Sequence, residues 1–292
     1  MTRCLLALCS TLAVVGCGGN QNTETIVPYS RENNSGTYMY FKEHVLGDAD
    51  FDAGIQTLPG TAAVINAVSK DRGSIGYGGI GYVKGVRLLH VRKDAASPAV
   101  EPTLETVVKG TYPISRYLYL YTVGQSEGGV KTYVDWILSG EGQKVCEEVG
   151  YFPLPGAPRP APAPAGDDKR SITVKGSDTM VILGQRWAEH YMNKNPTIDV
   201  KVTGGGSGTG IAALINGSTE ICQSSRPIKP KEREEIKKKF GKDAVETAVA
   251  MDGIAIFVHE SNPIREISIE QLKGIYTGKM KSWRELGPPD GK

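Results

Sequence analysis

Short β-rich runs alternate with amphipathic stretches along residues 26–155 and 172–292. Hydrophobic periodicity predicts strands at 74–82, 87–91, 118–123, 171–175, 199–203 and 253–259, and helices at 36–45, 61–71, 129–148, 181–193, 210–216, 229–240 and 269–277. Alternating strands and helices predict an α/β fold with mixed or parallel sheets. Ligands bind such folds where strands end and helices begin, so the strand-to-helix turns are where we expect a site.

The first hydrophobic run, residues 5–15, follows Arg3 and is too short to span a bilayer comfortably. It has the charged start of an export signal and ends in Leu-Ala-Val-Val-Gly before Cys17. This ending resembles a bacterial lipoprotein signal, in which the cysteine is lipidated. We therefore expect a signal peptide over 1–16, a tether over 17–25, and an extracytoplasmic protein anchored to the bacterial membrane by lipid at Cys17. An ordinary signal peptide with a coincidental cysteine is the alternative.

Residues 156–171 contain alternating alanine and proline, which favours an extended, semi-rigid linker. The 36 glycines and 17 prolines of the 292-residue chain predict many turns and argue against a helical bundle. The formal net charge is only +2, so composition gives no argument for a nucleic-acid partner. Outside the first segment the chain has only Cys146 and Cys222, which we expect to be isolated core residues, with one disulfide as the alternative.

Three strand-to-helix turns, over 175–180, 203–210 and 30–38, combine glycine with hydroxyl side chains. Their candidate residues are Thr179, Ser207, Thr209, Arg31, Ser35, Gly36 and Thr37. Helix N-termini offer free amides to anions, and the arginine fork matches two oxygens of one oxyanion. Helix capping, a flexible loop or a solvated arginine would each explain one turn alone. Together, the three turns predict a metal-free site for a small tetrahedral anion.

Several longer segments resemble the periplasmic phosphate-binding protein (PstS type) of bacterial phosphate ABC transporters. They are TVKGSDTM, TGGGSGTGI, SSRPIK, DGIAIFVHESNP, LKGIYTGKMKSWREL, SRENNSGTY and GSIGYGGIGYV, and the resemblance covers nearly all of 26–155 and 172–292. It implies a two-lobed periplasmic-binding-protein fold of type II, with mixed sheets, flanking helices and a ligand cleft between the lobes. It also implies inorganic phosphate as ligand, a membrane permease as partner, no cofactor, and a monomer.

The segments do not follow the family's order, because the segment resembling 172–292 comes first in the family. The resemblance therefore implies a circularly permuted chain whose proline-alanine linker joins the family's two ends. Tolerance of such a rearrangement is expected where the chain ends of a domain lie close together. Lobe one would combine 84–155 with 172–256, and lobe two would combine 26–83 with 257–292.

Carried over by position, the resemblance implies ligand contacts at Thr179, the Met180 amide, Ser207, Arg31, Ser35, Gly36 and Thr37. Ser225 stands where family members carry an aspartate that accepts the phosphate proton. We expect Asp178 to replace that acceptor, or Arg226 to add a second cation. The substitution leaves sulfate or another oxyanion open as an alternative ligand.

Two other functions compete with an anion receptor. A secreted phosphatase would usually need metals held by histidines and carboxylates, but the four histidines have no metal motif: His44, His90, His190 and His259. An adhesion module could use the tyrosines of 112–121, although packing along a strand explains them better. We therefore expect a binding protein rather than an enzyme.

Overall fold

A mixed sheet runs through the computed structural model, which describes residues 24–162 and 170–287. Its strands are β1 (Val27–Arg31), β2 (Gln56–Leu58), β3 (Ser74–Gly79), β4 (Arg87–Arg92), β5 (Ser115–Val123), β6 (Arg170–Gly176), β7 (Ile198–Thr203), β8 (Ile221–Ser224), β9 (Ala244–Val258) and β10 (Glu266–Ser268). The α-helices are α1 (Gly36–His44), α2 (Gly60–Val68), α3 (Leu104–Val108), α4 (Gly128–Ile137), α5 (Gly140–Val149), α6 (Val181–Lys194), α7 (Ser207–Asn216), α8 (Pro230–Phe240) and α9 (Ile269–Tyr276). Three short 3-10 helices are η1 (Ile80–Tyr82), η2 (Asp178–Met180) and η3 (Trp283–Leu286).

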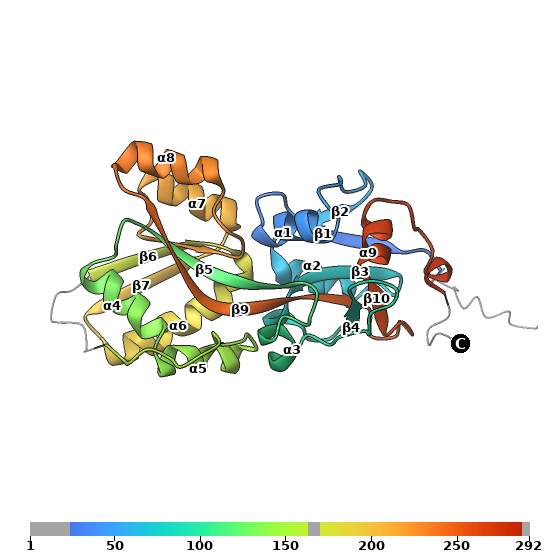
Figure 1. The fold of residues 1–292 in the computed structure, drawn as a ribbon, viewed down its shortest axis with the longest axis horizontal. Helices are drawn as coiled ribbons and strands as arrows, with labels where there is room; N and C mark the ends of the chain where they lie inside the picture. The colour runs from blue at the N-terminus through green and yellow to red at the C-terminus, as the bar shows by residue number, and fades with distance from the viewer. Residues whose placement is uncertain (1–23, 163–169, 288–292) are drawn as a thin grey trace, which may run out of the picture.

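Strand β9 crosses between two lobes (Figure 1). Up to Gly253 it pairs antiparallel with β5, and from Ile254 onward it pairs antiparallel with β3 and β4. We call the part with β5–β8 and α4–α8 lobe one, and the part with β1–β4, β10, α1–α3 and α9 lobe two. The predicted α/β fold with mixed sheets and flanking helices is confirmed, since parallel pairs such as β6 with β7 lie beside these antiparallel ones.

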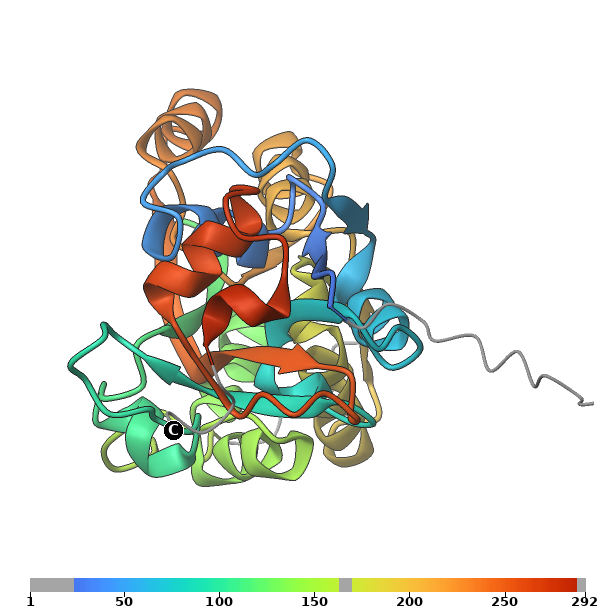
Figure 2. The same cartoon turned by 90° about the vertical axis from the view of Figure 1, so that its right-hand side faces the viewer.

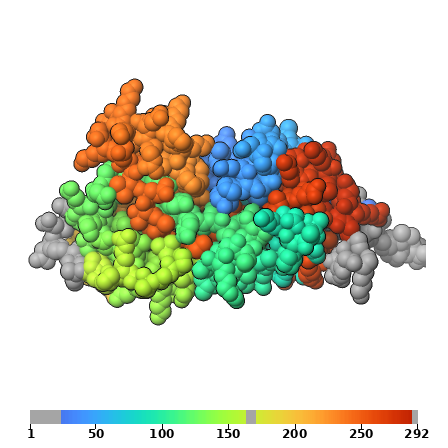
Figure 3. Space-filling model, in the orientation of Figure 1, coloured from blue at the N-terminus to red at the C-terminus, as the bar shows by residue number. Residues whose placement is uncertain are grey.

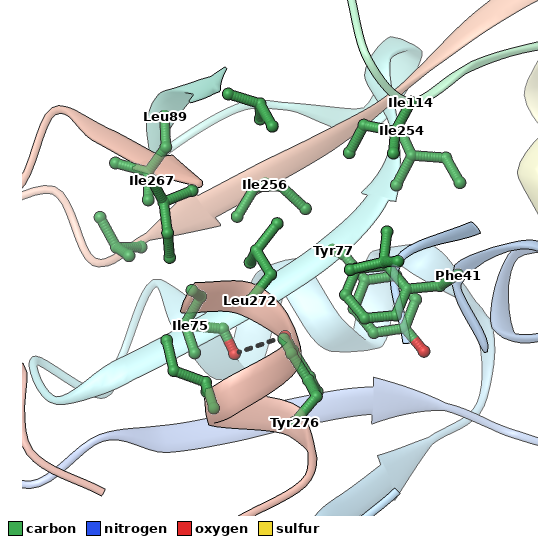
Figure 4. Packing of buried hydrophobic residues seen from close by; sticks show 14 of the residues in the cluster. Phe41, Ile75, Tyr77, Leu89, Ile114, Ile254, Ile256, Ile267, Leu272 and Tyr276 are labelled. Atoms are coloured by element: carbon green, nitrogen blue, oxygen red, sulfur yellow. Dashed lines mark hydrogen bonds between the residues drawn. The ribbon is translucent and has the colours of Figure 1, made fainter. Parts of the chain in front are cut away.

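Each lobe has its own apolar core. In lobe one, α6 places Leu183, Trp187 and Tyr191 on one face at a spacing of four residues, and all three are buried. In lobe two, the end of β9 is apolar without alternation because both of its faces are covered. Figure 4 shows Ile254 and Ile256 of this strand among Ile75, Leu272 and the stacked rings of Phe41 and Tyr77, whose centroids lie 4.0 Å apart.

Residues 84–114 lie in lobe two, which corrects their expected place in lobe one. Strand β4 pairs with β10 and with the end of β9, and Val107 of α3 packs in the lobe two core. The crossing point of β9, between Gly253 and Ile254, also comes earlier than the expected boundary at 256. Strand pairing decides this assignment, and the sequence pattern of a strand does not reveal its partner.

The predicted helix over 129–148 is two helices, α4 and α5. Ser139 interrupts it, because its hydroxyl caps α5 by accepting from the Gly142 amide at 3.5 Å. Helix α7 begins at Ser207, earlier than predicted, so this candidate residue lies in the first turn of the helix. Cys146 and Cys222 are buried and form no disulfide, as expected for isolated core residues.

The expected signal peptide, Cys17 and most of the expected tether lie outside the described residues. Within the described part of the chain, every helix is too short or too polar to cross a membrane. The start of the described chain contacts η3 in lobe two, the lobe that faces the viewer in Figure 2: Thr25 bridges Ser282, and the Trp283 amide donates to the Glu24 carbonyl at 2.8 Å.

Candidate functional site

Three helix starts converge where the lobes meet. Helix α1 from lobe two begins at Gly36 after Ser35, whose hydroxyl accepts from the Thr37 and Tyr38 amides. From lobe one come the start of α7, at Ser207, and η2, which leads into α6. Neither of these two starts has a side-chain cap, and the positive end of a helix dipole favours a negatively charged ligand. The structure thus brings the three predicted turns together.

Five buried hydroxyls form the centre of this region, contributed by Thr37, Ser177, Thr179, Ser207 and Ser225. The Thr37 and Thr179 oxygens lie 2.8 Å apart and join the two lobes. Within lobe one, Ser177 donates to Ser225 at 2.9 Å, and the Ser225 amide donates to the Ser207 hydroxyl at 3.1 Å. Each hydroxyl carries one rotatable proton, so the cluster can turn several donors toward a negatively charged ligand.

Arg31 ends β1 with a completely buried side chain at the edge of this cluster. Its Nη1 donates to Thr61 at 2.8 Å, and its Nη2 donates to Glu32 Oε1 at 3.1 Å and to Asp178 Oδ2 at 3.2 Å. The two carboxylates are partly exposed, at 25% for Glu32 and 19% for Asp178. The guanidinium is therefore neutralised by side chains that retain contact with solvent.

The pKa values near Arg31 follow from burial and pairing. Partial burial would raise the pKa of the Glu32 carboxyl, but its hydrogen bonds to Arg31 outweigh this effect and lower the pKa below its usual value. Burial raises the pKa of Tyr82 to about 12, so its hydroxyl stays protonated and donates to the Asp178 carbonyl at 2.7 Å. Asp178 is further fixed because its Oδ1 accepts from the Gly205 amide at 2.8 Å.

Backbone contacts close the lobes around the site. The Gly208 amide of α7 donates to the Asn34 carbonyl at 2.9 Å, and the Asn34 side chain donates to the Gly205 carbonyl at 3.0 Å. A Cβ on Gly36 would lie only 2.4 Å from the Ser207 hydroxyl and 2.5 Å from that of Ser225. In the space-filling view the segment with β1 and α1 (blue) abuts lobe one (Figure 3). Glycine is required at position 36 for this approach.

Two predicted candidates point elsewhere. Arg226 donates to both carboxylate oxygens of Glu232, at 2.9 and 2.6 Å, so its guanidinium faces the start of α8 rather than supplying a second cation to the hydroxyl cluster. The Met180 amide donates to the Ser177 carbonyl at 3.0 Å, and the Met180 side chain is part of the lobe one core.

Sequence reasoning missed a second buried arginine, Arg116 at the start of β5. It donates to Asp252 through Nε at 3.0 Å and Nη2 at 2.7 Å, and to the Thr37 hydroxyl through Nη2 at 2.9 Å. Burial raises the pKa of the Asp252 carboxyl, an effect that the Arg116 guanidinium opposes. The available signal was an acid and a base each placed just ahead of an apolar run that predicts a buried strand.

A model of the PBP superfamily domain matches residues 19–141 and 161–292. Phosphate-binding protein PstS 2 from Streptococcus agalactiae is 31% identical over 97% of both chains. The chain belongs to the PBP superfamily and to its PstS family. Another PstS family member, from Bacillus subtilis, is 38% identical over 44% of this chain and 41% of its own. A solved phosphate-binding protein of a phosphate ABC transporter from Streptococcus pneumoniae has 26% identity and a TM-score of 0.68, covering 90% of this chain and 99% of the other.

Proposed function

We propose that this protein captures inorganic phosphate outside the cytoplasmic membrane and delivers it to the permease of an ABC transporter. The observation that carries the proposal is the convergence of hydroxyl-rich helix starts from both lobes beside Arg31. The names of the PstS relatives support phosphate as the ligand. Thr179, Ser207, Ser225, Arg31, Ser35, Gly36 and Thr37 line the site in this proposal.

The donor set is sufficient for useful affinity. A dissociation constant near 1 μM corresponds to about −8 kcal/mol. Hydrogen bonds to a charged group contribute roughly 1.5–3 kcal/mol each, before the cost of ordering the ligand is subtracted. The hydroxyls of Thr37, Thr179, Ser207 and Ser225, with the guanidinium of Arg31, provide enough donors.

Titration of the purified protein with phosphate in a calorimeter tests the function. We expect one phosphate per chain with a dissociation constant of about 1 μM or below. Absence of binding would overturn the proposal. Release of p-nitrophenol from its phosphate ester, abolished by a chelator, would instead favour a phosphatase. The contacts of the histidines do not suggest one, since His190 pairs with Glu148, His259 with Ser261, and His44 stacks on Tyr40.

Asp178 accepts the phosphate proton in this proposal, in place of the aspartate that Ser225 replaces. Its side chain is partly exposed and forms an ion pair with Arg31, so the carboxylate can exchange this partner for a ligand without full desolvation. A carboxylate acceptor favours phosphate, which retains a proton at neutral pH, and repels sulfate, which has none. Asp178→Asn should therefore lower the phosphate-to-sulfate affinity ratio about tenfold, whereas Asp199→Asn in β7 should not. An unchanged ratio would assign the discrimination to another group.

Lipidation at Cys17 anchors the protein in this account, and residues 1–16 are removed. The chain is a monomer on the outer side of the membrane. Detergent phase partition of the expressed protein tests the anchor, because Cys17→Ser should move the protein from the detergent phase to the aqueous phase. Equal partition of both forms would contradict lipidation.

The chain is also circularly permuted, in this proposal, relative to PstS proteins such as the one from Bacillus subtilis, of which it matches only 41%. The contacts between Thr25 and Ser282 and between Glu24 and Trp283 support it, since they place the start of lobe two beside η3. The linker is held at its start, where the Arg159 amide donates to the Leu138 carbonyl at 3.0 Å. A variant that joins 287 to 24 and opens the linker between 163 and 169 should bind phosphate with unchanged affinity. Loss of folding in that variant would contradict the proposed order.

A further inference from the structure

Arg116 contacts three separate parts of the molecule. Directly opposite it in the sheet is Asp252, next to the point where β9 crosses from lobe one to lobe two. Nη1 of Arg116 donates to the Ser225 carbonyl at 2.9 Å in lobe one, and Nη2 donates to the Thr37 hydroxyl of lobe two. The Arg116 side chain is 2% exposed and the Asp252 side chain is 0% exposed.

The Asp252 carboxylate fixes the guanidinium from the other side. Its Oδ2 accepts from both Nε and Nη2 of Arg116, so two N–H groups of the guanidinium are held by one carboxylate oxygen. Its Oδ1 accepts from the Ile80 amide at 3.0 Å, so the carboxylate is itself held by lobe two backbone. Arg116 therefore presents its remaining N–H groups in one orientation.

This orientation determines how the Thr37 hydroxyl is used. A hydroxyl has one proton and two lone pairs, and Arg116 occupies a lone pair of the Thr37 oxygen. The Thr37 oxygen keeps its proton and one lone pair for other partners, and the Thr179 hydroxyl lies 2.8 Å from it across the lobes. A phosphate oxygen that replaces Thr179 as the partner of Thr37 would receive that proton.

We propose that Arg116 is a positioning residue for anion binding, which orients the Thr37 hydroxyl as a donor and ties it to lobe one when the lobes close. The inference rests on the proposed phosphate function. Arg116 does not touch the anion in this account, since its effect passes through Thr37. The Arg116–Thr37 hydrogen bond joins the two lobes, because Arg116 lies in β5 of lobe one and Thr37 in α1 of lobe two.

A double-mutant cycle on phosphate affinity tests the proposal. Arg116→Gln should weaken binding about tenfold in the wild-type background and less than about twofold in a Thr37→Val background, because the hydroxyl on which Arg116 acts is gone. In a Thr37→Ser background, which keeps the hydroxyl, the tenfold effect should return. A merely structural role would give the same loss in all three backgrounds, and that result would overturn the proposal.

Two further variants serve as a replacement for Arg116→Gln and as a control. If Arg116→Gln does not fold, Arg116→Lys replaces it, since a lysine can pair with Asp252 but lacks the fork that reaches Ser225 and Thr37 together. Arg226→Gln, which breaks another arginine–carboxylate pair in lobe one, should leave phosphate affinity within about twofold. Wild-type protein that binds no phosphate would refute the proposed function itself. Normal phosphate binding with additive effects of the Arg116 and Thr37 substitutions would refute only the role of Arg116.

Discussion

Two buried arginines lie near the hydroxyl cluster, and they differ in how exposed their carboxylate partners are. Arg31 pairs with Glu32 and Asp178, whose side chains are 25% and 19% exposed, whereas Arg116 pairs with the fully buried Asp252. A carboxylate in contact with water can exchange its partner at modest cost, but removing one member of a buried pair leaves an uncompensated charge. The comparison indicates that Arg31 is suited to share its donors with a ligand, and Arg116 is suited to hold another group in place.

The largest expected effect concerns the buried pair. Asp252→Ala should reduce the free energy of unfolding by about 3–5 kcal/mol, because it leaves the Arg116 charge unpaired in the interior. Glu32→Ala should cost less than about 1 kcal/mol, because that pair is partly exposed. Urea denaturation of both variants measures the difference. Equal losses would remove the distinction between the two arginines.

Arg31→Ala should weaken phosphate binding by about tenfold or more, because it removes charged donors from the site. Arg31→Lys keeps the charge but lacks the planar fork, so an intermediate affinity is expected. Calorimetric titration measures both variants. Unchanged affinity in Arg31→Ala would exclude Arg31 from the site.

Gly36→Ala tests whether closure requires the tight approach of α1 to lobe one. The added Cβ would meet the Ser207 and Ser225 hydroxyls at 2.4 and 2.5 Å, so we expect phosphate affinity to fall about tenfold. Gly140→Ala is the matched control, since Gly140 also begins a helix and its added Cβ would meet Pro158 at an ordinary 3.6 Å. Similar affinities for the two variants would argue against closure at Gly36.

The smallest expected effect is a pH dependence at the Arg31 pair. The pKa of Glu32 is lowered in the folded protein, so its ionised form stabilises the fold above its usual pKa of 4.5, and this contribution disappears as the pH falls through the folded value. Glu32→Gln should therefore be less stable than wild type near pH 6, and the difference should shrink as the pH falls below the usual pKa, as measured by urea denaturation. A difference that grows toward acid pH would contradict the assigned pairing.

The residues of the candidate site could be predicted from the sequence more completely than the boundaries of the lobes. Arg31, Ser35 and Thr37 lie in a single strand-to-helix turn. All three predicted turns combine glycine and hydroxyl residues with the start of a helix, which is a local pattern that the sequence shows directly. Arg116 has no such local signal, because Asp252, Ser225 and Thr37 are separated from it by 136, 109 and 79 residues. The expected lobe of residues 84–114 was wrong for the same reason, because β9 and β10, the strands that pair with β4, lie far from it in the sequence.

A crystal structure of the protein with bound phosphate tests the central claim most directly. We predict phosphate oxygens within hydrogen-bond distance of the Arg31 guanidinium and of the Thr37 and Thr179 hydroxyls, with Arg116 still donating to Thr37 and not to phosphate. Phosphate bound directly to Arg116, or at a place away from the hydroxyl cluster, would contradict the account.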